Sequence, residues 1–271
     1  LLLAGALIPF STQIEVRNVA DTQRAMESVR EAIIGFAQAT GRLPCPANGS
    51  TPAGAAGAGT EVKPFLPCSF AFGVVPWTTL GVPETDAWGR RFSYGVSPAF
   101  ADVSSTTWST TTTTTPTSPA NQNPLCTPTP TPNAPTTFAL CSLGDIAVFT
   151  RGGTTTTAVP MSTAIPAVII SHGKNGAGAW QTNGIRLTPI PSGNDEAANV
   201  NGNMTATPAV TSGYLSRAFY SRTPTPAASG CVDPIPGGPA STAPLCEFDD
   251  IVVVLSPSTL IARMVAAGRL P

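Results

Sequence analysis

The chain opens with an apolar segment that passes directly into a regular mixture of apolar and charged positions. Residues 1–10 are almost wholly apolar, and charges begin with Glu15 and Arg17. From there apolar residues recur at intervals of 7, 3, 4 and 3, at Val19, Met26, Val29, Ile33 and Phe36. These intervals are typical of the buried face of an amphipathic helix.

Charge spacing and stop signals define the extent of this helix. Pairs of opposite charge lie three or four residues apart, at Arg17–Asp21, Asp21–Arg24 and Glu27–Arg30, where they meet on a helix surface. Gly41 suits the position that ends a helix, and Pro44 prevents its continuation. We therefore predict a helix of about 35–40 residues, roughly 50–60 Å long. Its first third is apolar all round, so it should leave its own domain and be buried in another structure.

Beyond the helix the hydrophobic runs are short and are separated by proline and glycine. A turn over residues 86–89 precedes an alternating run, Phe92 and Tyr94 against Arg91 and Ser93, that predicts a strand. Further strands are predicted within residues 144–153, 166–176 and 246–257. The run at 166–176 is continuously apolar, so we expect it near the centre of a sheet.

The last apolar run has the signals of a helix. Ser256 suits the N-cap, Pro257 the first helical position and Gly268 the position after the end. We expect a buried face made by Leu260, Ile261, Met264 and Val265.

The composition restricts the class of protein. Only 11% of the 271 residues are charged and the net charge is −1, which gives no electrostatic reason to expect a nucleic-acid partner. With 29 prolines and 25 glycines, long regular elements must be few. We expect an assembly helix at residues 1–40 and a β-rich head at 41–271, with a Thr/Pro-rich insertion at about 102–140 and a loop at about 221–247.

Six cysteines predict disulfides, because each lies in a loop-like stretch rich in proline, glycine or threonine and no pair has zinc-ligand spacing. Disulfides place the protein outside the cytoplasm. Fifteen connectivities are possible, and the simplest joins nearest neighbours: Cys45–Cys68, Cys126–Cys141 and Cys231–Cys246.

Catalytic motifs are not supported. His172 is the sole histidine, and the residues around Ser171 do not form a nucleophile elbow, so we interpret His172 as structural. The pair Asp195/Glu196 is interpreted as a polar surface turn, with an oxygen-rich calcium loop as the alternative. Asp249 and Asp250 open a strand, and we expect them to cap it or to pair with arginine. We predict that the chain is not an enzyme and needs no cofactor or metal.

The order of motifs resembles the type IV pilin and type II secretion pseudopilin superfamily. "AGALIPFSTQ" is similar to the end of the pilin hydrophobic segment, with its bending proline, and "TDAWGRRFSY" to the Asp-Pro-Trp-Gly motif of major pseudopilins. "VIISHGKNGAGAW" is similar to the strand and loop that follow in that family. "RLPCPA", "VPWTTLG" and "FDDIVVVLSPSTL" resemble prepilin-like proteins with larger heads.

The resemblance implies an α+β fold, with a long N-terminal helix packed on an antiparallel β-sheet head that carries large disulfide-closed loops. It also implies that about a dozen residues precede Leu1, in the segment that a prepilin peptidase exposes. The pseudopilin calcium loop is altered here, because Lys174 would repel a cation, and Asp195 could correspond to one downstream ligand.

The function implied is that of a structural subunit of an extracellular, type IV pilus-like filament. The implied partners are further copies of the chain. Before assembly the subunit would lie in the inner membrane, and in the filament its exposed head would serve adhesion or surface interaction. The residues implied in assembly are Leu1, Leu2, Leu3, Leu7, Ile8, Pro9, Phe10, Ile14 and Val19. Two alternatives remain open: a minor pseudopilin of a type II secretion system, and a secreted, helix-tethered carbohydrate-binding or hydrolytic β-domain.

The Thr/Pro-rich insertion predicts O-linked glycans, because hydroxyl runs broken by proline cannot pack a core and are typical of glycosylated stalks. The candidate positions are Ser109, Thr110, Thr111, Thr112, Thr113, Thr114, Thr115, Thr117 and Ser118. Mass spectrometry of native protein should show hexose-sized increments on the peptide that contains them. A single peak at the bare polypeptide mass would contradict the prediction.

Overall fold

A computed structural model describes residues 2–62, 68–101, 136–140, 142–152, 158–191, 193–202, 217–234 and 241–270, with residues 2–11 described by backbone alone. In chain order the elements are α1 (Leu2–Thr40), β1 (Phe72–Val74), α2 (Trp77–Leu80), β2 (Ser93–Val96), α3 (Pro98–Ala101), β3 (Ile146–Thr150), β4 (Val159–Ile165), β5 (Ala167–Ser171), α4 (Asn194–Asn201), β6 (Arg217–Tyr220), β7 (Ile251–Leu255) and α5 (Pro257–Ala266). The fold is α+β, and the Thr/Pro-rich insertion lies outside the described residues except for residues 136–140.

The strands form two sheets. A four-stranded antiparallel sheet has the order β1-β2-β5-β7, and a three-stranded sheet has the order β4-β3-β6. β5 pairs with β2 on one side and β7 on the other, so the apolar run at 166–176 does lie inside a sheet. A single antiparallel sheet was expected. The structure instead has a second sheet, in which β3 and β6 run parallel.

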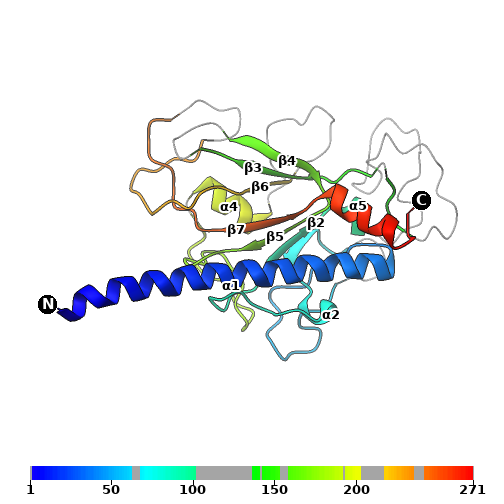
Figure 1. The fold of residues 1–271 in the computed structure, drawn as a ribbon, viewed down its shortest axis with the longest axis horizontal. Helices are drawn as coiled ribbons and strands as arrows, with labels where there is room; N and C mark the ends of the chain where they lie inside the picture. The colour runs from blue at the N-terminus through cyan, green and yellow to red at the C-terminus, as the bar shows by residue number, and fades with distance from the viewer. Residues whose placement is uncertain are drawn as a thin grey trace.

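The layers stack from α1 outwards. One face of the four-stranded sheet packs against α1 and α5 through a core that includes Met26, Ile33, Tyr94, Ile169 and Leu260. The other face packs against the three-stranded sheet. The outer face of that second sheet carries α4. Figure 1 shows the blue α1 on one side of β5 and β7, with β3 and β4 on the other.

Burial of both faces explains why β2 departs from simple alternation. All four of its residues are buried, including Ser93, which was expected to face away from the core. α5 shows the opposite difference, because one residue expected on its buried face is exposed. Leu260 and Met264 are buried, but Val265 is 43% exposed, because one stripe of this short helix faces α1 and the sheet.

The second half of α1 is a layer of the head, and the first half is not. Its buried positions are Thr22, Met26, Val29, Ile33, Ile34 and Ala37. The apolar pattern does not indicate Thr22, whose hydroxyl accepts a hydrogen bond from the Ala87 amide (3.2 Å). Towards the N-terminus the helix extends beyond the head (Figure 1). Ile14 and Val16 are 58% and 65% exposed there.

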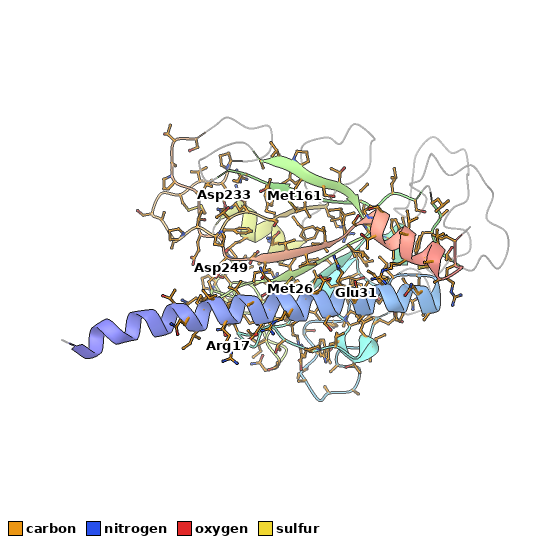
Figure 2. All side chains as sticks on the ribbon, in the orientation of Figure 1. Arg17, Met26, Glu31, Met161, Asp233 and Asp249 are labelled. Carbon is orange, nitrogen blue, oxygen red and sulfur yellow. A yellow bond between two sulfur atoms is a disulfide. The ribbon has the colours of Figure 1, made fainter. Side chains whose placement is uncertain are left out.

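The end of α1 and its surface charges are as predicted. Gly41 adopts a left-handed conformation, φ 80°, and its amide donates to the Ala37 carbonyl (2.7 Å). All three ion pairs form, at Arg17–Asp21 (3.7 Å), Asp21–Arg24 and Glu27–Arg30. Arg17 and Glu31 lie on opposite sides of the helix midpoint in Figure 2.

Two of the three expected disulfides are present. Cys45–Cys68 and Cys231–Cys246 span 23 and 15 residues respectively. The pair Cys126–Cys141 lies outside the described residues. Next to the first disulfide, Arg42 donates two hydrogen bonds to Glu61 (2.8 and 2.7 Å) and so fixes the loop to the end of α1.

These contacts predict unequal roles for the two halves of α1. Replacing the buried Ile33 with alanine should lower the free energy of unfolding by about 2–4 kcal/mol, through lost burial and a cavity. The matched control, Ile14→Ala, should change it by less than about 0.5 kcal/mol, because Ile14 is exposed in the single chain. Urea unfolding of the full chain, followed by tryptophan fluorescence, measures both. Equal effects would contradict the assignment of the helix halves.

Candidate functional site

α4 is attached to the head through buried ion pairs. Asp195, in its first turn, accepts hydrogen bonds from Arg151 (2.7 Å) and Arg222 (2.8 Å). Arg222 also reaches Asp233 (3.3 Å), which lies near the Cys231–Cys246 disulfide. Burial raises the pKa of Asp195 to about 6, repulsion by Asp233 adds to the rise, and the two arginines oppose it. Both oxygens of Asp195 are therefore engaged in holding α4 in place.

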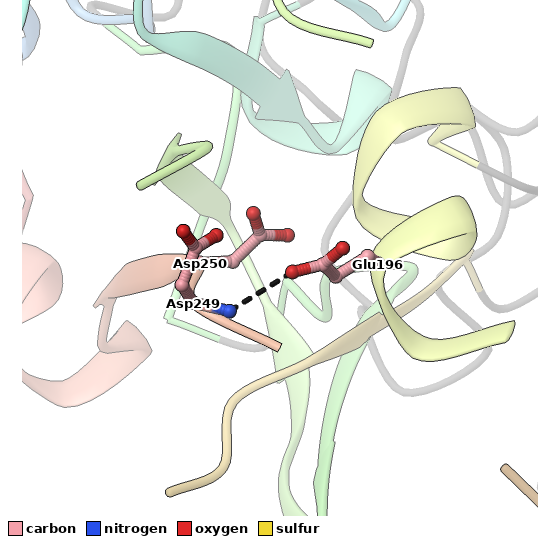
Figure 3. A group of neighbouring side chains, drawn as sticks. All are labelled: Glu196, Asp249 and Asp250. Atoms are coloured by element: carbon pink, nitrogen blue, oxygen red, sulfur yellow. Dashed lines mark hydrogen bonds between the residues drawn. The ribbon is translucent and has the colours of Figure 1, made fainter. Parts of the chain in front are cut away.

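The next residue of α4 belongs to a different group of carboxylates. Glu196 lies beside Asp249 and Asp250, which lead into β7, and one oxygen from each of the three lies within 4.8 Å of the others. Figure 3 shows the three side chains gathered between α4 and the start of β7. We call Glu196, Asp249 and Asp250 the acidic cluster.

Amides hold the acidic cluster in place. The Asp249 amide donates to Glu196 (2.9 Å), and the backbone amide of Asn175, in the loop after β5, donates to Asp249 (2.7 Å). The side chain of Asn199, one turn further along α4, donates to Asp250 (2.8 Å) and to the Tyr220 carbonyl (2.9 Å). The cluster thus joins α4, the β5 loop and β7.

The cluster differs from the Asp195 site because, among the described residues, no lysine or arginine pairs with its carboxylates. In the described part of the chain, no lysine or arginine forms an ion pair with Glu196, Asp249 or Asp250. Burial, followed by repulsion from Asp250, raises the pKa of Glu196 to about 8. Burial is also the main cause that raises the pKa of Asp249 to about 6.

Three oxygen ligands held in this way can share protons or hold a hard cation. Carboxylate oxygens are the ligands that Ca²⁺ takes in proteins, so these three residues are the ones that could hold such an ion. One oxygen of Asp249 is buried without a hydrogen-bond partner among the described residues. Asp195 is not available as a ligand, since two arginines already bind it.

His172 connects the acidic cluster to the four-stranded sheet. Its Nε2 is 2.8 Å from the Ser93 hydroxyl, and its Nδ1 is 3.5 Å from Asp250. The order serine, histidine, aspartate is that of a hydrolase triad. However, Ser93, His172 and Asp250 are only 3%, 1% and 7% exposed, so no substrate carbonyl can reach the hydroxyl. This burial agrees with the structural interpretation of His172.

Both acidic pairs are evident in the sequence, but the sequence does not show that Glu196 lies beside Asp249 and Asp250 in the fold. Asp195 and Glu196 were expected in a polar surface turn, and this was wrong, because both are buried in α4. Asp249 and Asp250 were expected to cap a strand or pair with arginine, and in the described residues they pair with neither lysine nor arginine. The signal that could have been used is the scarcity of acids: only 15 acidic residues are present, and two pairs of them are adjacent.

The expected assembly and glycan positions are only partly within the described residues. Leu2, Leu3, Leu7, Ile8, Pro9 and Phe10 belong to the helical backbone of α1, Ile14 is exposed and Val19 half-buried. Leu1 and all candidate glycan positions, Ser109–Ser118, lie outside the described residues. Lys174 is exposed, with its Nζ 3.6 Å from Glu15 on α1.

No protein-family model, curated protein or solved structure matches this chain. Its function is therefore argued from the arrangement of its own residues.

The acidic cluster predicts a pH-dependent stability. A carboxyl whose pKa is raised on folding stabilises the fold while it is protonated, so stability falls as pH rises from about 4.5 towards about 8, the two values for Glu196. The variant Glu196→Gln keeps an acceptor for the Asp249 amide and removes the charge. At pH 9 it should be more stable than the wild type by about 1–3 kcal/mol, and at pH 4 nearly equal to it.

Urea unfolding at pH 4, 6 and 9 measures this difference, with EDTA present so that no cation neutralises the cluster. Glu27→Gln removes an exposed charge from α1, outside the cluster, and should leave the pH profile almost unchanged. A wild type and a Glu196→Gln variant with parallel profiles would rule out a repulsive cluster.

Proposed function

We propose that this chain is the structural subunit of an extracellular, type IV pilus-like filament that polymerises through α1. The single observation that supports it most directly is the unequal burial of this helix. The head covers the stretch from Thr22 to Ala37, whereas the helix continues N-terminally beyond it (Figure 1).

The N-terminal part of α1 has a composition that needs a partner. Residues 1–10 consist entirely of leucine, isoleucine, alanine, glycine, proline and phenylalanine. Further along, Ile14 and Val16 remain exposed on the single chain. An apolar run of this length gains free energy by leaving water, and helices of neighbouring copies offer the matching surface.

The geometry of such a contact leads to a polymer. When such helices pack alongside one another with their heads displaced along a common axis, each contact joins different faces of two neighbouring helices. Contacts between unlike faces that do not close into a ring generate a helical filament. The heads would then lie outside, where they are available for adhesion.

One further observation is compatible with this placement. The disulfides indicate an oxidising, non-cytoplasmic environment. Within the described residues, no helix is long and apolar enough to cross a bilayer.

The filament proposal predicts that a charge in the apolar part of α1 prevents assembly. Leu7→Lys or Ile8→Lys should abolish filaments, because a buried lysine without a partner costs several kcal/mol at every subunit contact. Electron microscopy of assembled material is the measurement. The control Gln23→Lys adds the same charge to an exposed position of the embedded half and should leave assembly intact.

Thermal unfolding keeps this test interpretable. The head of each lysine variant should unfold at the wild-type temperature, because the substitutions lie outside the part of α1 that the head covers. Filaments that persist with Leu7→Lys and Ile8→Lys would contradict assembly through this helix.

A further inference from the structure

A pocket of about 260 Å³ lies on the head, away from the acidic cluster's carboxylates. Four separate segments line it: the loop after α1, β1, the loop after β5, and the C-terminal end of α4. Pockets for drug-sized ligands span about 300–1,000 Å³, so this one fits a molecule with a single ring.

The walls of the pocket are aromatic and closely supported. Phe70, Phe72 and Trp180 line it. A Cβ on Gly49 would come within 2.5 Å of the Trp180 ring, and one on Gly202 within 2.4 Å of the Phe72 ring. Backbone therefore packs directly against these two rings, and the Phe72 ring also lies 5.6 Å from the Phe219 ring.

Arg186 brings a positive charge to the pocket. Its Nε donates to the Gly178 carbonyl (2.7 Å) and one terminal nitrogen donates to the Val200 carbonyl, while the guanidinium lies 5.8 Å from the centre of the Trp180 ring. Among the described residues, none supplies a carboxylate within ion-pair distance of it. Burial lowers the pKa of Arg186, so a bound anion would stabilise its charged form.

Two amides add further donors at the rim. The Asn48 side-chain oxygen accepts hydrogen bonds from the Ser50 backbone amide (2.9 Å) and the Ser50 hydroxyl (2.8 Å). The Asn48 NH₂ group therefore remains as a donor. Asn201, the last residue of α4, is exposed and also lines the pocket. Arg186 and the Asn48 NH₂ group present only donors, and a ligand rich in acceptor oxygens complements them.

Aromatic faces, a fixed cation and rim amides together define a class of ligand. We propose that this pocket binds a single pyranose ring that carries a carboxylate, a hexuronate. The apolar C–H groups of the sugar contact the aromatic wall made by Phe70, Phe72 and Trp180. The carboxylate faces Arg186, and the hydroxyl oxygens accept hydrogen bonds from Asn48 and Asn201. The site lies wholly on the head, so the proposal does not depend on filament formation.

Titration of the full chain in detergent micelles with four probes tests each part of this assignment. Sodium glucuronate and sodium galacturonate carry both the ring and the carboxylate, methyl glucoside lacks the carboxylate, and sodium gluconate lacks the ring. Saturation-transfer NMR at up to about 20 mM ligand detects binding in the millimolar range. A uronate should bind at least about tenfold more tightly than either of the two incomplete probes.

A matched pair of variants separates the pocket from general surface charge. Asn201→Asp replaces a donor by a negative charge at the rim and should weaken uronate binding at least about tenfold. Asn183→Asp places the same charge on the β5 loop outside the pocket, keeps the oxygen that accepts from the Ile185 amide, and should change binding less than about twofold. Arg186→Gln should remove the preference for a uronate over methyl glucoside.

Each other outcome overturns the proposal. Failure of both uronates to bind would show that the pocket is not a sugar site. Equal binding of gluconate would exclude the role of the ring, equal binding of methyl glucoside would exclude that of Arg186, and unchanged binding by Asn201→Asp would place the ligand elsewhere. Because Asn201 is an exposed residue at the end of α4, its variant remains informative even if Arg186→Gln does not fold.

Discussion

The packing of the second half of α1 against the four-stranded sheet is the contact on which the rest of the head depends. Met26, Val29 and Ile33 are almost completely buried there, among residues of β2, β5 and α5. With this face covered by a helix and the other by the second sheet, the central strands are apolar on both sides. A buried central sheet in turn gives fixed ends to β5 and β7, and the loops at those ends carry Asp249, Asp250 and the Asn175 amide that binds Asp249.

A protein with few charges uses several of them in its interior. Arg42 pairs with Glu61, Arg91 with Glu84, and Arg217 with Asp145, and each of these arginines is less than 6% exposed at its side chain. Most of these arginines also donate to backbone carbonyls of separate segments, as Arg217 does to Ala71 and Val96. Buried pairs of this kind hold irregular loops in one conformation where few regular hydrogen bonds exist. Against that background the acidic cluster is unusual, because among the described residues amides and His172, and no lysine or arginine side chain, contact its carboxylates.

Local sequence signals were sufficient to predict the elements in which those signals are strong. The end of α1 at Gly41, its three ion pairs, the strands β3, β5 and β7, and two disulfides follow from spacing, apolar runs and neighbouring cysteines. α4 could not be predicted, because "NDEAANVN" is polar and reads as a turn. Its helical form depends on Asp195 meeting Arg151 and Arg222, and on Asn199 meeting both backbone groups of Tyr220, contacts that sequence does not reveal. The acidic cluster was missed for the same reason, since Glu196 and Asp249 meet across 53 residues.

The way α1 enters the head also has a mechanical consequence. The buried contacts run lengthwise from Thr22 to Ala37, over about 22 Å of helix at 1.5 Å per residue. A pull on the N-terminal end acts along this line, so it loads the interlocked side chains in shear. In shear the contacts must yield together, whereas a force across the helix would peel them apart one turn at a time. The same packing that buries the sheet therefore lets α1 transmit tension to the head without unfolding the head.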